Sequence, residues 1–360
     1  MTKNESLLKQ VLSIPTAPFE ESNVVQFIKT WAKRKGLRVR QDKAGNILFS
    51  YKKGRALKRP WLFHAHMDHP GFVALKQKGR ILHADFRGGV KKSYFKNSRV
   101  CFFCKNSKVK GSVLSVRKEK KTGFLKCRIA LDNDKPVPPG TIGLWDVPVY
   151  RRKGNRVHAR VCDDLVGVAV ILAVFDRLIR RKADVHVIAM FTRAEEVGFI
   201  GTLKSCADYG IPKNARMVCM ETSRIQPGIN LGAGAVVRTG DRGLTFDPLL
   251  TFLLCSIANK VAKKDKAFKC ARALMQGGMT ETSAFVMFGY QAGAVCIPLD
   301  NYHNMHSSGK VAPEIIDIRD FNNLIKLLFG AAITRVTPEE NQKLLMRRYR
   351  KKCDQLCRYL

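Results

Sequence analysis

The chain has 360 residues, of which 45% are hydrophobic, so it can bury a large core and is not an intrinsically disordered protein. Its longest apolar run, residues 165–175, is too short to cross a bilayer, and its charged first residues lack the apolar stretch of a secretory signal. Eleven cysteines without the spacing of a disulfide scaffold indicate reduced thiols. These features predict a cytoplasmic protein with no membrane partner.

The charge is strongly positive and unevenly distributed. The formal net charge is +36, and residues 71–158 alone carry 22 basic against 5 acidic side chains. Such charge attracts acidic partners: nucleic acid, an anionic surface or acidic peptides. It is also typical of the solvated surface of a basic protein. We favour this second interpretation because no nucleic-acid motif with interleaved aromatic residues accompanies the charge, and we therefore do not expect a nucleic-acid partner.

The first 70 residues predict two helices and three strands. Apolar residues recur at helical spacing over 3–13 and 19–35. Strand patterns follow at 37–42, 46–53 and 61–66, and the last of these is apolar enough to be buried in a sheet.

Short alternating segments separated by turn residues occupy the next part of the chain. They are GFVALKQ, ILHADF, RVCFFC, GSVLSVRK, FLKCRIAL, GTIGLW and PVYRR, all between residues 71 and 157. This pattern predicts an all-β module, a small barrel.

After residue 164, helix and strand patterns alternate again. We expect helices at 167–180, 198–208, 248–264, 282–288 and 317–333, and strands at 183–192, 215–222 and 292–299. Alternation of this kind indicates an α/β fold whose mainly parallel sheet is sandwiched by helices.

The domain organisation follows from these patterns. Residues 1–70 and 158–336 form one α/β domain, and the basic β module at 71–157 is inserted into it. Residues 337–360 form a basic tail, which is an amphipathic or frayed helix from Lys343 onward and is expected to be solvated.

Five polar clusters fall at the ends of predicted strands or in adjoining loops, where ligands gather in open α/β sheets. They are His66 with Asp68, Asp163-Asp164, Glu195-Glu196, Glu221, and His306. Each has an ordinary structural explanation when taken alone. The paired Asp could cap a helix, the paired Glu could face a helix dipole, and each histidine could be a satisfied structural residue.

Taken together, the clusters predict a metal centre. Imidazole and carboxylate ligands at one sheet edge suit a pair of divalent ions with one bridging carboxylate. Two such ions generate hydroxide from water and stabilise an oxyanion, while a free glutamate moves the proton. Glu221 supports this prediction, because an acid at the end of an apolar strand is costly unless it is paired or ligating.

Six motifs in order resemble a known family. They are FHAHMDHPGFV, ARVCDDLVGVAVIL, FTRAEEVGFIGT, METS, LGAGAVV and NMHS. They resemble the glutamyl aminopeptidase/endoglucanase-M-like family of dinuclear metallo-aminopeptidases, which forms tetrahedral peptidase assemblies. That family places a β-barrel dimerisation domain between its first His ligand and its Asp ligand, and here the β module lies between His66 and Asp163.

The resemblance implies a role for each site residue. It implies that two divalent ions (zinc or cobalt, with manganese as a further option) are held by His66, Asp163, Glu196, Glu221 and His306. Asp163 would bridge the ions and Asp68 would orient His66. Glu195 would be the general base.

Three departures from the family pattern concern the substrate rather than the metal chemistry. Glu221 stands where aminopeptidases of this kind usually have Asp, whereas Glu is usual in related carboxypeptidases and deacylases. The segment containing Glu281 has an altered acid, and His69 replaces a frequent Glu.

We therefore predict a metal-dependent aminopeptidase that hydrolyses short peptides. A water molecule bridging the ions would attack the first peptide carbonyl, and Glu195 would carry its proton to the leaving amine. A homo-oligomer is expected, from a dimer up to a tetrahedral dodecamer. Two alternatives stay open: a carboxypeptidase or N-acyl-amino-acid deacylase with the same centre, and an inactive, basic relative that binds nucleic acid.

Overall fold

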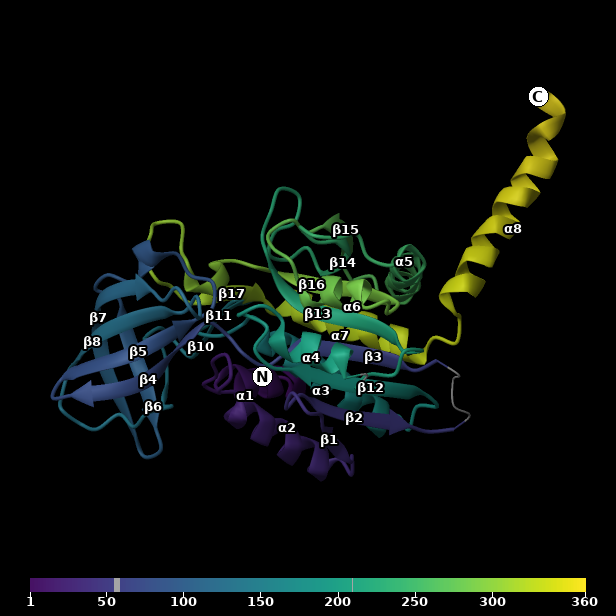
Figure 1. The fold of residues 1–360 in the computed structure, drawn as a ribbon. Helices are drawn as coiled ribbons and strands as arrows, with labels where there is room; N and C mark the ends of the chain where they lie inside the picture. The colour runs from purple at the N-terminus through teal and green to yellow at the C-terminus, as the bar shows by residue number, and fades with distance from the viewer. Residues whose placement is uncertain (55–58, 209) are drawn as a thin grey trace.

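A central sheet positions everything else in the larger body of the protein (Figure 1). The computed structural model describes residues 1–54, 59–208 and 210–360. Along the sheet the strands are β1 (Val39–Gln41), β2 (Ile47–Lys52), β12 (His186–Thr192), β3 (Trp61–His66), β13 (Arg216–Arg224), β16 (Ala292–Leu299), β14 (Ala235–Gly240) and β15 (Cys270–Leu274).

The four strands at the middle of the sheet, β12, β3, β13 and β16, are parallel to one another. Strands β2 and β14 pair antiparallel with the outer members of this group. The middle strands are almost wholly buried because helices cover both faces, which explains their near-continuous apolar sequences. Their carboxyl ends lie at one edge of the sheet, where polar residues accumulate.

Helices cover the two faces of the sheet unequally. One face packs against α1 (Lys3–Leu12), α2 (Ser22–Arg34), α3 (Leu165–Arg180), α5 (Pro248–Lys264) and α7 (Ile318–Ile333). The other face packs against α4 (Ile200–Ala207) and α6 (Glu281–Met287). Asp164 begins α3 by accepting a hydrogen bond from the backbone N–H of Gly167, so one member of the paired Asp is the helix cap. The predicted α/β class, with a mainly parallel sheet between helices, is confirmed.

The β module closes into a six-stranded barrel beside this body (Figure 1). Its strands are β4 (Gly71–Lys78), β5 (Ile81–Arg87), β8 (Leu125–Leu131), β7 (Ser107–Lys118), β6 (Arg99–Cys104) and β9 (Ile142–Trp145), in the order of pairing. Phe72, Phe86, Phe95 and Trp145 fill the interior with ring centroids 4.8–6.1 Å apart. The predicted barrel-like module is therefore correct in kind.

The last strand predicted for the module lies outside the closed barrel. This strand, β10 (Tyr150–Lys153), pairs with β11 (Arg156–Ala159), and β11 pairs in turn with β17 (Glu314–Asp317). The resulting three-stranded sheet brings the segment before Asp163 next to a segment from the far end of the chain.

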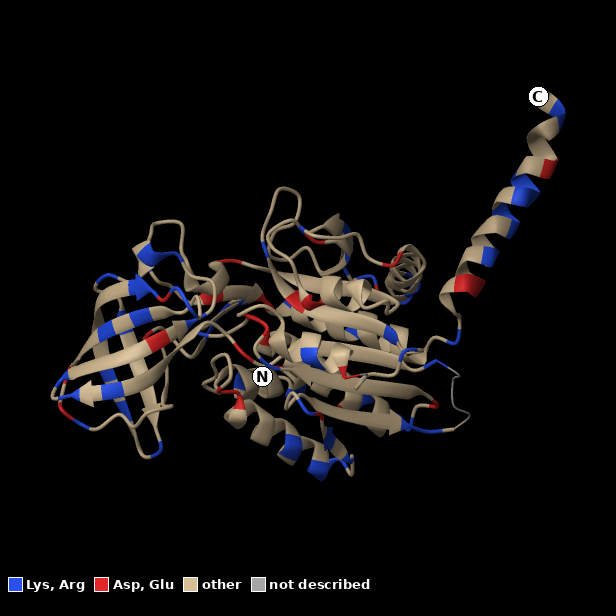
Figure 2. Ribbon diagram, viewed as in Figure 1, with Lys and Arg blue, Asp and Glu red and all other residues tan. Residues whose placement is uncertain are grey.

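The C-terminal residues form a longer helix than the sequence indicated. Helix α8 (Pro338–Leu356) projects away from the body (Figure 1) and carries many of its basic residues into solvent (Figure 2). None of the helices in the described part of the chain combines the length and apolarity needed to cross a bilayer.

Candidate metal centre

The site lies at the carboxyl ends of the parallel strands, as the sequence predicted for such a sheet. His66 is the last residue of β3, Glu221 stands near the end of β13, and Glu195 and Glu196 follow β12. Asp163 precedes α3, in the segment that enters from β11. The five side chains come from separate parts of the chain, and the parallel sheet brings them together.

The side chains form two groups that could each hold a cation. One group contains His66, Glu195 and Glu221, and the other contains Asp163, Glu196 and His303. Within each group the potential ligand atoms lie within 4.8 Å of one another. A mixed set of imidazole nitrogen and carboxylate oxygen suits transition-metal ions such as zinc.

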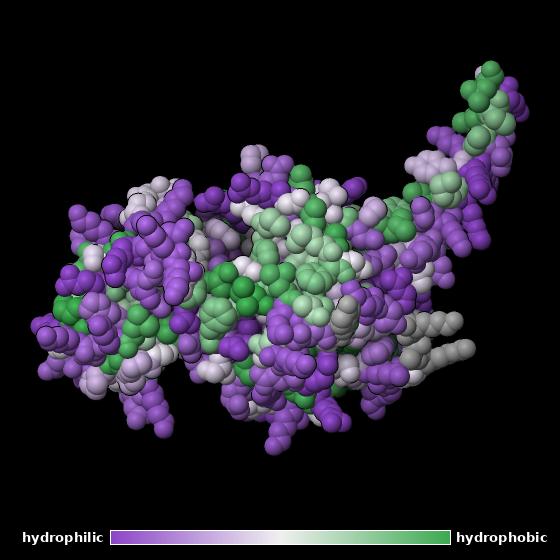
Figure 3. Space-filling view, in the orientation of Figure 1, coloured by the Kyte–Doolittle hydropathy of each residue, from purple (hydrophilic) through white to green (hydrophobic). Residues whose placement is uncertain are grey.

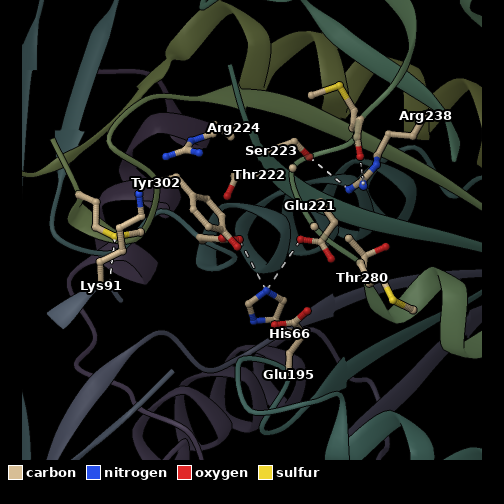
Figure 4. A pocket seen from close by; sticks show the side chains of 16 residues that line it. His66, Lys91, Glu195, Glu221, Thr222, Ser223, Arg224, Arg238, Thr280 and Tyr302 are labelled. Carbon is tan, nitrogen blue, oxygen red and sulfur yellow. Dashed lines mark hydrogen bonds and ion pairs between the residues drawn. The ribbon is translucent and has the colours of Figure 1, made fainter. Parts of the chain in front are cut away.

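Asp163, a member of the second group, also faces the first group. One of its carboxylate oxygens is 3.6 Å from Nε2 of His66, and the other is 3.5 Å from Nε2 of His303. His303 is also 3.0 Å from Oε1 of Glu196. Figure 4 shows Glu221 and Glu195 around the His66 ring. A carboxylate in this position can contact two ions at once.

The structure does not bring His306 to the centre, and His303 occupies the place expected for it. His306 is only half-buried; its Nδ1 is 2.8 Å from the hydroxyl of Ser308, and its carbonyl accepts a hydrogen bond from Tyr94. The backbone turns sharply after β16, with left-handed φ values of 54° at Asn301 and 55° at His303. The early turn directs the first histidine of the loop inward, so matching the later His-Ser pair to the family motif selected the wrong residue.

Contacts from two directions hold the His303 ring. Its Nδ1 donates to the carbonyl of Gly89, 2.8 Å away, so Nε2 is left to face the carboxylates. The Tyr302 ring stacks on it with centroids 3.7 Å apart. Gly89 lies within the barrel module, in the loop that follows β5, so the insertion itself helps to orient a residue of the centre.

Glu314 ties together two loops of the centre. This β17 residue is fully buried and accepts hydrogen bonds from the backbone N–H groups of Cys162 (2.6 Å), Asp163 (3.1 Å) and His303 (2.8 Å). Sequence reasoning missed it. An acid within the apolar segment PEII was the available signal, because a buried carboxylate requires partners.

Asp68 performs the same function on the opposite side. Its carboxylate accepts hydrogen bonds from the backbone N–H groups of Glu195 and Glu196, both at 3.0 Å, and its Oδ1 is 3.5 Å from Nδ1 of His66. One residue therefore orients the imidazole and also holds the turn that presents both glutamates.

Glu281, the acid in the segment that departs from the family pattern, lies near the candidate ligands. Its carboxylate accepts hydrogen bonds from Thr192 (2.9 Å) and Thr202 and lies 3.1 Å from Nε2 of His64. Burial raises the pKa of Glu281, but His64, His66 and the hydrogen bond from Thr202 together lower it more, so the net shift is downward. Glu281 belongs to neither of the two ligand groups.

The electrostatics of the buried centre favour positive charge. Burial lowers the pKa of His66, but Glu195, Asp163 and Asp68 raise it more, so this pKa lies well above its ordinary value. Burial raises the pKa of Glu195 well above its ordinary value and that of Glu221 to about 8. A bound cation would relieve both effects, because it neutralises the carboxylates without a proton.

Unpartnered atoms point to the same conclusion. Oδ1 of Asp163 and Oε1 of Glu221 are buried and have no hydrogen-bond partner among the described residues. Nε2 of His303 and Oε1 of Glu196 lie 3.0 Å apart, but the contact does not have the geometry of a hydrogen bond. Buried polar atoms are normally satisfied, so atoms that face one another without partners fit a site for an ion. The residues present therefore suit a pair of divalent cations.

A small cavity of about 140 Å³ opens beside the centre (Figure 4). Cationic side chains line it together with His66, namely Lys91, Arg224 and Arg238. Arg238 is only 2% exposed, and its guanidinium donates to Ser223 Oγ at 3.2 Å and to the Met275 carbonyl at 3.5 Å. Its Nε has no hydrogen-bond partner among the described residues, and sequence reasoning did not identify it.

The fold and the site define a class of protein. It is an α/β protein with an inserted barrel, in which a buried set of imidazoles and carboxylates at the sheet edge can hold two cations. The model of the M42 glutamyl aminopeptidase family matches residues 45–327. The chain therefore belongs to this family of metallopeptidases, which confirms the resemblance seen in its motifs.

Solved structures show the same fold. A TET aminopeptidase from a marine-sediment Thaumarchaeota archaeon is 19% identical, with a TM-score of 0.76 over 95% of this chain and 98% of that one. An aminopeptidase from Desulfurococcus kamchatkensis is 22% identical, with a TM-score of 0.75 over 95% and 97%. The TET1 peptidase of Pyrococcus horikoshii, which can assemble into a tetrahedron or an octahedral shell, is 21% identical, with a TM-score of 0.74 over 92% and 99%.

Proposed function

We propose that this protein is a metal-dependent aminopeptidase that removes residues from the amino end of short peptides. The convergence of two ligand groups on Asp163 is the observation that carries this proposal. One ion would be held by His66, Glu221 and Asp163, and the other by Asp163, Glu196 and His303. Zinc or cobalt suits these donors best, and manganese is a further option.

Such ions, when bound, lower the pKa of water and polarise the carbonyl of the substrate. The remaining chemistry belongs to the protein. Glu195 faces the same space as His66 and Glu221, and its carboxylate would accept the proton of the attacking water. The same carboxylate then delivers the proton to the leaving amine. Asp68 keeps Glu195 in position through the backbone.

Family membership favours the aminopeptidase over the carboxypeptidase or deacylase alternative. The position of the barrel, between His66 and Asp163, also supports this choice. Glu221 in place of Asp is the one feature that favours the alternative. Peptides with a free amino end, assayed beside N-blocked peptides, separate the two; hydrolysis confined to the blocked set would overturn our choice.

Arg238 supports a preference among substrates. A buried guanidinium beside the centre with an unsatisfied Nε is suited to a carboxylate, which can accept hydrogen bonds from two of its nitrogens. We therefore propose that the cavity accepts an acidic side chain of the substrate.

The domain roles and the assembly are also proposals. Residues 1–70 and 158–336 would form the catalytic domain, and the barrel at 71–157 would serve oligomerisation and cover the site. The assembly of the Pyrococcus horikoshii relative supports a homo-oligomer. Cytoplasmic location and the absence of a nucleic-acid partner remain predictions.

Metal analysis combined with peptide digestion tests the proposed function. We expect close to two equivalents of divalent metal per chain, loss of activity with a chelator, and recovery on adding zinc or cobalt. A protein that binds no metal, or that cleaves equally well after metal removal, would contradict the proposal.

A further inference from the structure

Helix α8 presents an apolar stripe that nothing in the described structure covers. Only its first turn is attached to the body: Pro338 and Asn341 are buried, and Asn341 donates to Ser256 Oγ at 3.1 Å. Beyond Asn341 the helix residues are exposed, apart from the half-buried Leu345. Sequence reasoning expected a solvated tail, which does not account for this stripe.

The stripe is continuous along the helix. At 100° per residue, Leu345, Tyr349, Cys353 and Leu356 fall within an arc of about 80°, and Met346 lies at its edge. The side chain of Tyr349 is 61% exposed and that of Leu356 is 48% exposed. Figure 3 shows hydrophobic residues gathered toward the free end of the helix, among hydrophilic ones.

Positive charge borders this stripe on both sides. Residues 343–360 contain seven Lys and Arg against one acid, Asp354. Lys352 and Arg348 fall on one flank of the stripe and Arg350 on the other, so their long stems can lie beside it while their charged ends reach outward. Figure 2 shows basic residues along most of the helix.

We propose that α8 docks on an anionic lipid surface, with its stripe in the interface and its basic flanks on the lipid headgroups. A helix with one apolar face and a Lys/Arg-rich remainder has the composition that binds such interfaces. The tyrosine rings of Tyr349 and Tyr359 suit the same boundary, because each has an apolar body and a polar tip. This inference is independent of the proposed peptidase activity.

Charge and apolarity together select this partner. Nucleic acid would engage the basic flanks but leave the stripe in water. A second copy of the chain carries the same net charge of +36, and two copies of α8 would bring like charges together. An anionic bilayer satisfies both features of the helix at once. Burial of the stripe would also stabilise the helix, since a segment of this length is marginal without tertiary contacts.

Vesicle flotation of the full-length protein tests the proposal. We expect the protein to float with vesicles that contain both phosphatidylcholine and phosphatidylserine, but not with vesicles of pure phosphatidylcholine. Binding to the anionic vesicles should weaken as the salt concentration increases. The double variant Tyr349→Ser/Leu356→Ser should bind at least about ten-fold more weakly. Gln355→Ser, on the same helix but off the stripe, is its control and should bind normally.

A second pair of variants separates the helix from general surface charge. Arg347→Gln/Arg348→Gln/Arg350→Gln should weaken vesicle binding by about ten-fold or more. Lys118→Gln/Lys120→Gln/Lys121→Gln removes the same charge from an exposed hairpin of the barrel and should leave binding unchanged. Equal losses in the two triple variants would overturn the proposal. Unchanged melting temperatures show that each variant is folded.

Two other possible partners of helix α8, a second copy of the chain and nucleic acid, would give different results in these experiments. If Tyr349→Ser/Leu356→Ser changes the molar mass of the protein by light scattering in the absence of vesicles, the stripe is an interface between copies, and the lipid proposal is overturned. The lipid proposal is also overturned if the protein binds duplex DNA but binds neither type of vesicle.

Discussion

The candidate metal centre has two parts that are built in different ways: a strand-built end with His66 and Glu221, and a loop-built end with Asp163 and His303. His66 and Glu221 stand on β3 and β13, so the pairing of parallel strands places them directly. Asp163 and His303 stand in loops, and a third residue, Glu314, holds both loops through their backbone N–H groups. The comparison teaches that a strand end needs little further support, whereas a ligand on a loop requires a buried polar residue to fix its backbone.

The largest effect is expected at Glu195, which is the proposed base and is not one of the proposed metal ligands at either end of the centre. Glu195→Gln keeps the size of the side chain but removes the base, so turnover should fall by about 10²–10⁴-fold. Metal content, measured by elemental analysis, should be unchanged, because the ligands at both ends are intact. Glu119→Gln on the barrel is the matched surface control. Full activity in Glu195→Gln would disprove the base assignment.

Variants of His303 and His306 test which histidine of this loop is a metal ligand at the loop-built end. His303→Ala should remove one equivalent of metal and reduce activity by about a hundred-fold or more, because a ligand is lost outright. His306→Ala, three residues further along the same loop, should retain both the metal and the activity. If the two variants behave in the opposite way, the turn after β16 directs the other ring inward, and the assignment is wrong.

Glu314 supports the loop-built end through hydrogen bonds to the backbone, and it can be replaced without changing any proposed metal ligand. Glu314→Ala should lower metal affinity by about 10–100-fold, since three backbone donors lose their acceptor. Titration with a competing chelator measures this affinity. Asp320→Asn is a suitable control, because Asp320 likewise gathers the N–H groups of Gly232 and Gly234, but outside the centre. Equal loss in both variants would show a general effect on stability instead.

His66 and Glu221, at the strand-built end, line the same cavity as Arg238. Arg238→Met should lower kcat/KM for peptides that begin with Glu by about ten-fold or more, with a smaller change for peptides that begin with Leu. Arg224→Met, which changes an exposed guanidinium of the same cavity, should have little effect. A uniform loss across substrates in Arg238→Met would indicate that this residue supports Glu221 rather than the substrate.

The smallest effect is on stability. Burial raises the pKa of Asp320 to about 6, above its ordinary value, while the N–H groups of Gly232 and Gly234 oppose the shift. The folded state therefore holds this proton more tightly than the unfolded state. The resulting stabilisation is present below pH 4 and is lost as the pH rises through 6, by roughly 1–3 kcal/mol. Asp320→Asn should flatten this part of the profile in urea unfolding, and an unchanged slope would contradict the assignment.

Much of the fold could be predicted because apolar periodicity is local. Helix α5 and strand β16 begin and end where the sequence indicated. Strands β11, β14, β15 and β17 were missed. β15 is short and largely half-exposed, and β17 exists through its pairing with β11. The pairing of β10 with β11 was likewise invisible, because an alternating pattern does not say which neighbour a strand will choose.

Most of the candidate site was also predictable, because carboxylates and histidines at the ends of buried strands are costly unless they meet a partner. His66, Asp163, Glu196 and Glu221 lie together as expected, with Asp68 and Glu195 beside them. His303 and Glu314 were not predicted. Their positions depend on left-handed backbone in one loop and on hydrogen bonds between segments far apart in the chain.

The amino-acid sequence by itself determined the kinds of donor atoms, their order along the chain, and the α/β framework that gathers them. It could do so because side-chain chemistry and strand or helix periodicity are properties of neighbouring residues. The tertiary structure decided which histidine of the last loop turns inward, which acid holds the loops, and which guanidinium lines the cavity. Those choices arise from contacts between residues that only folding brings together.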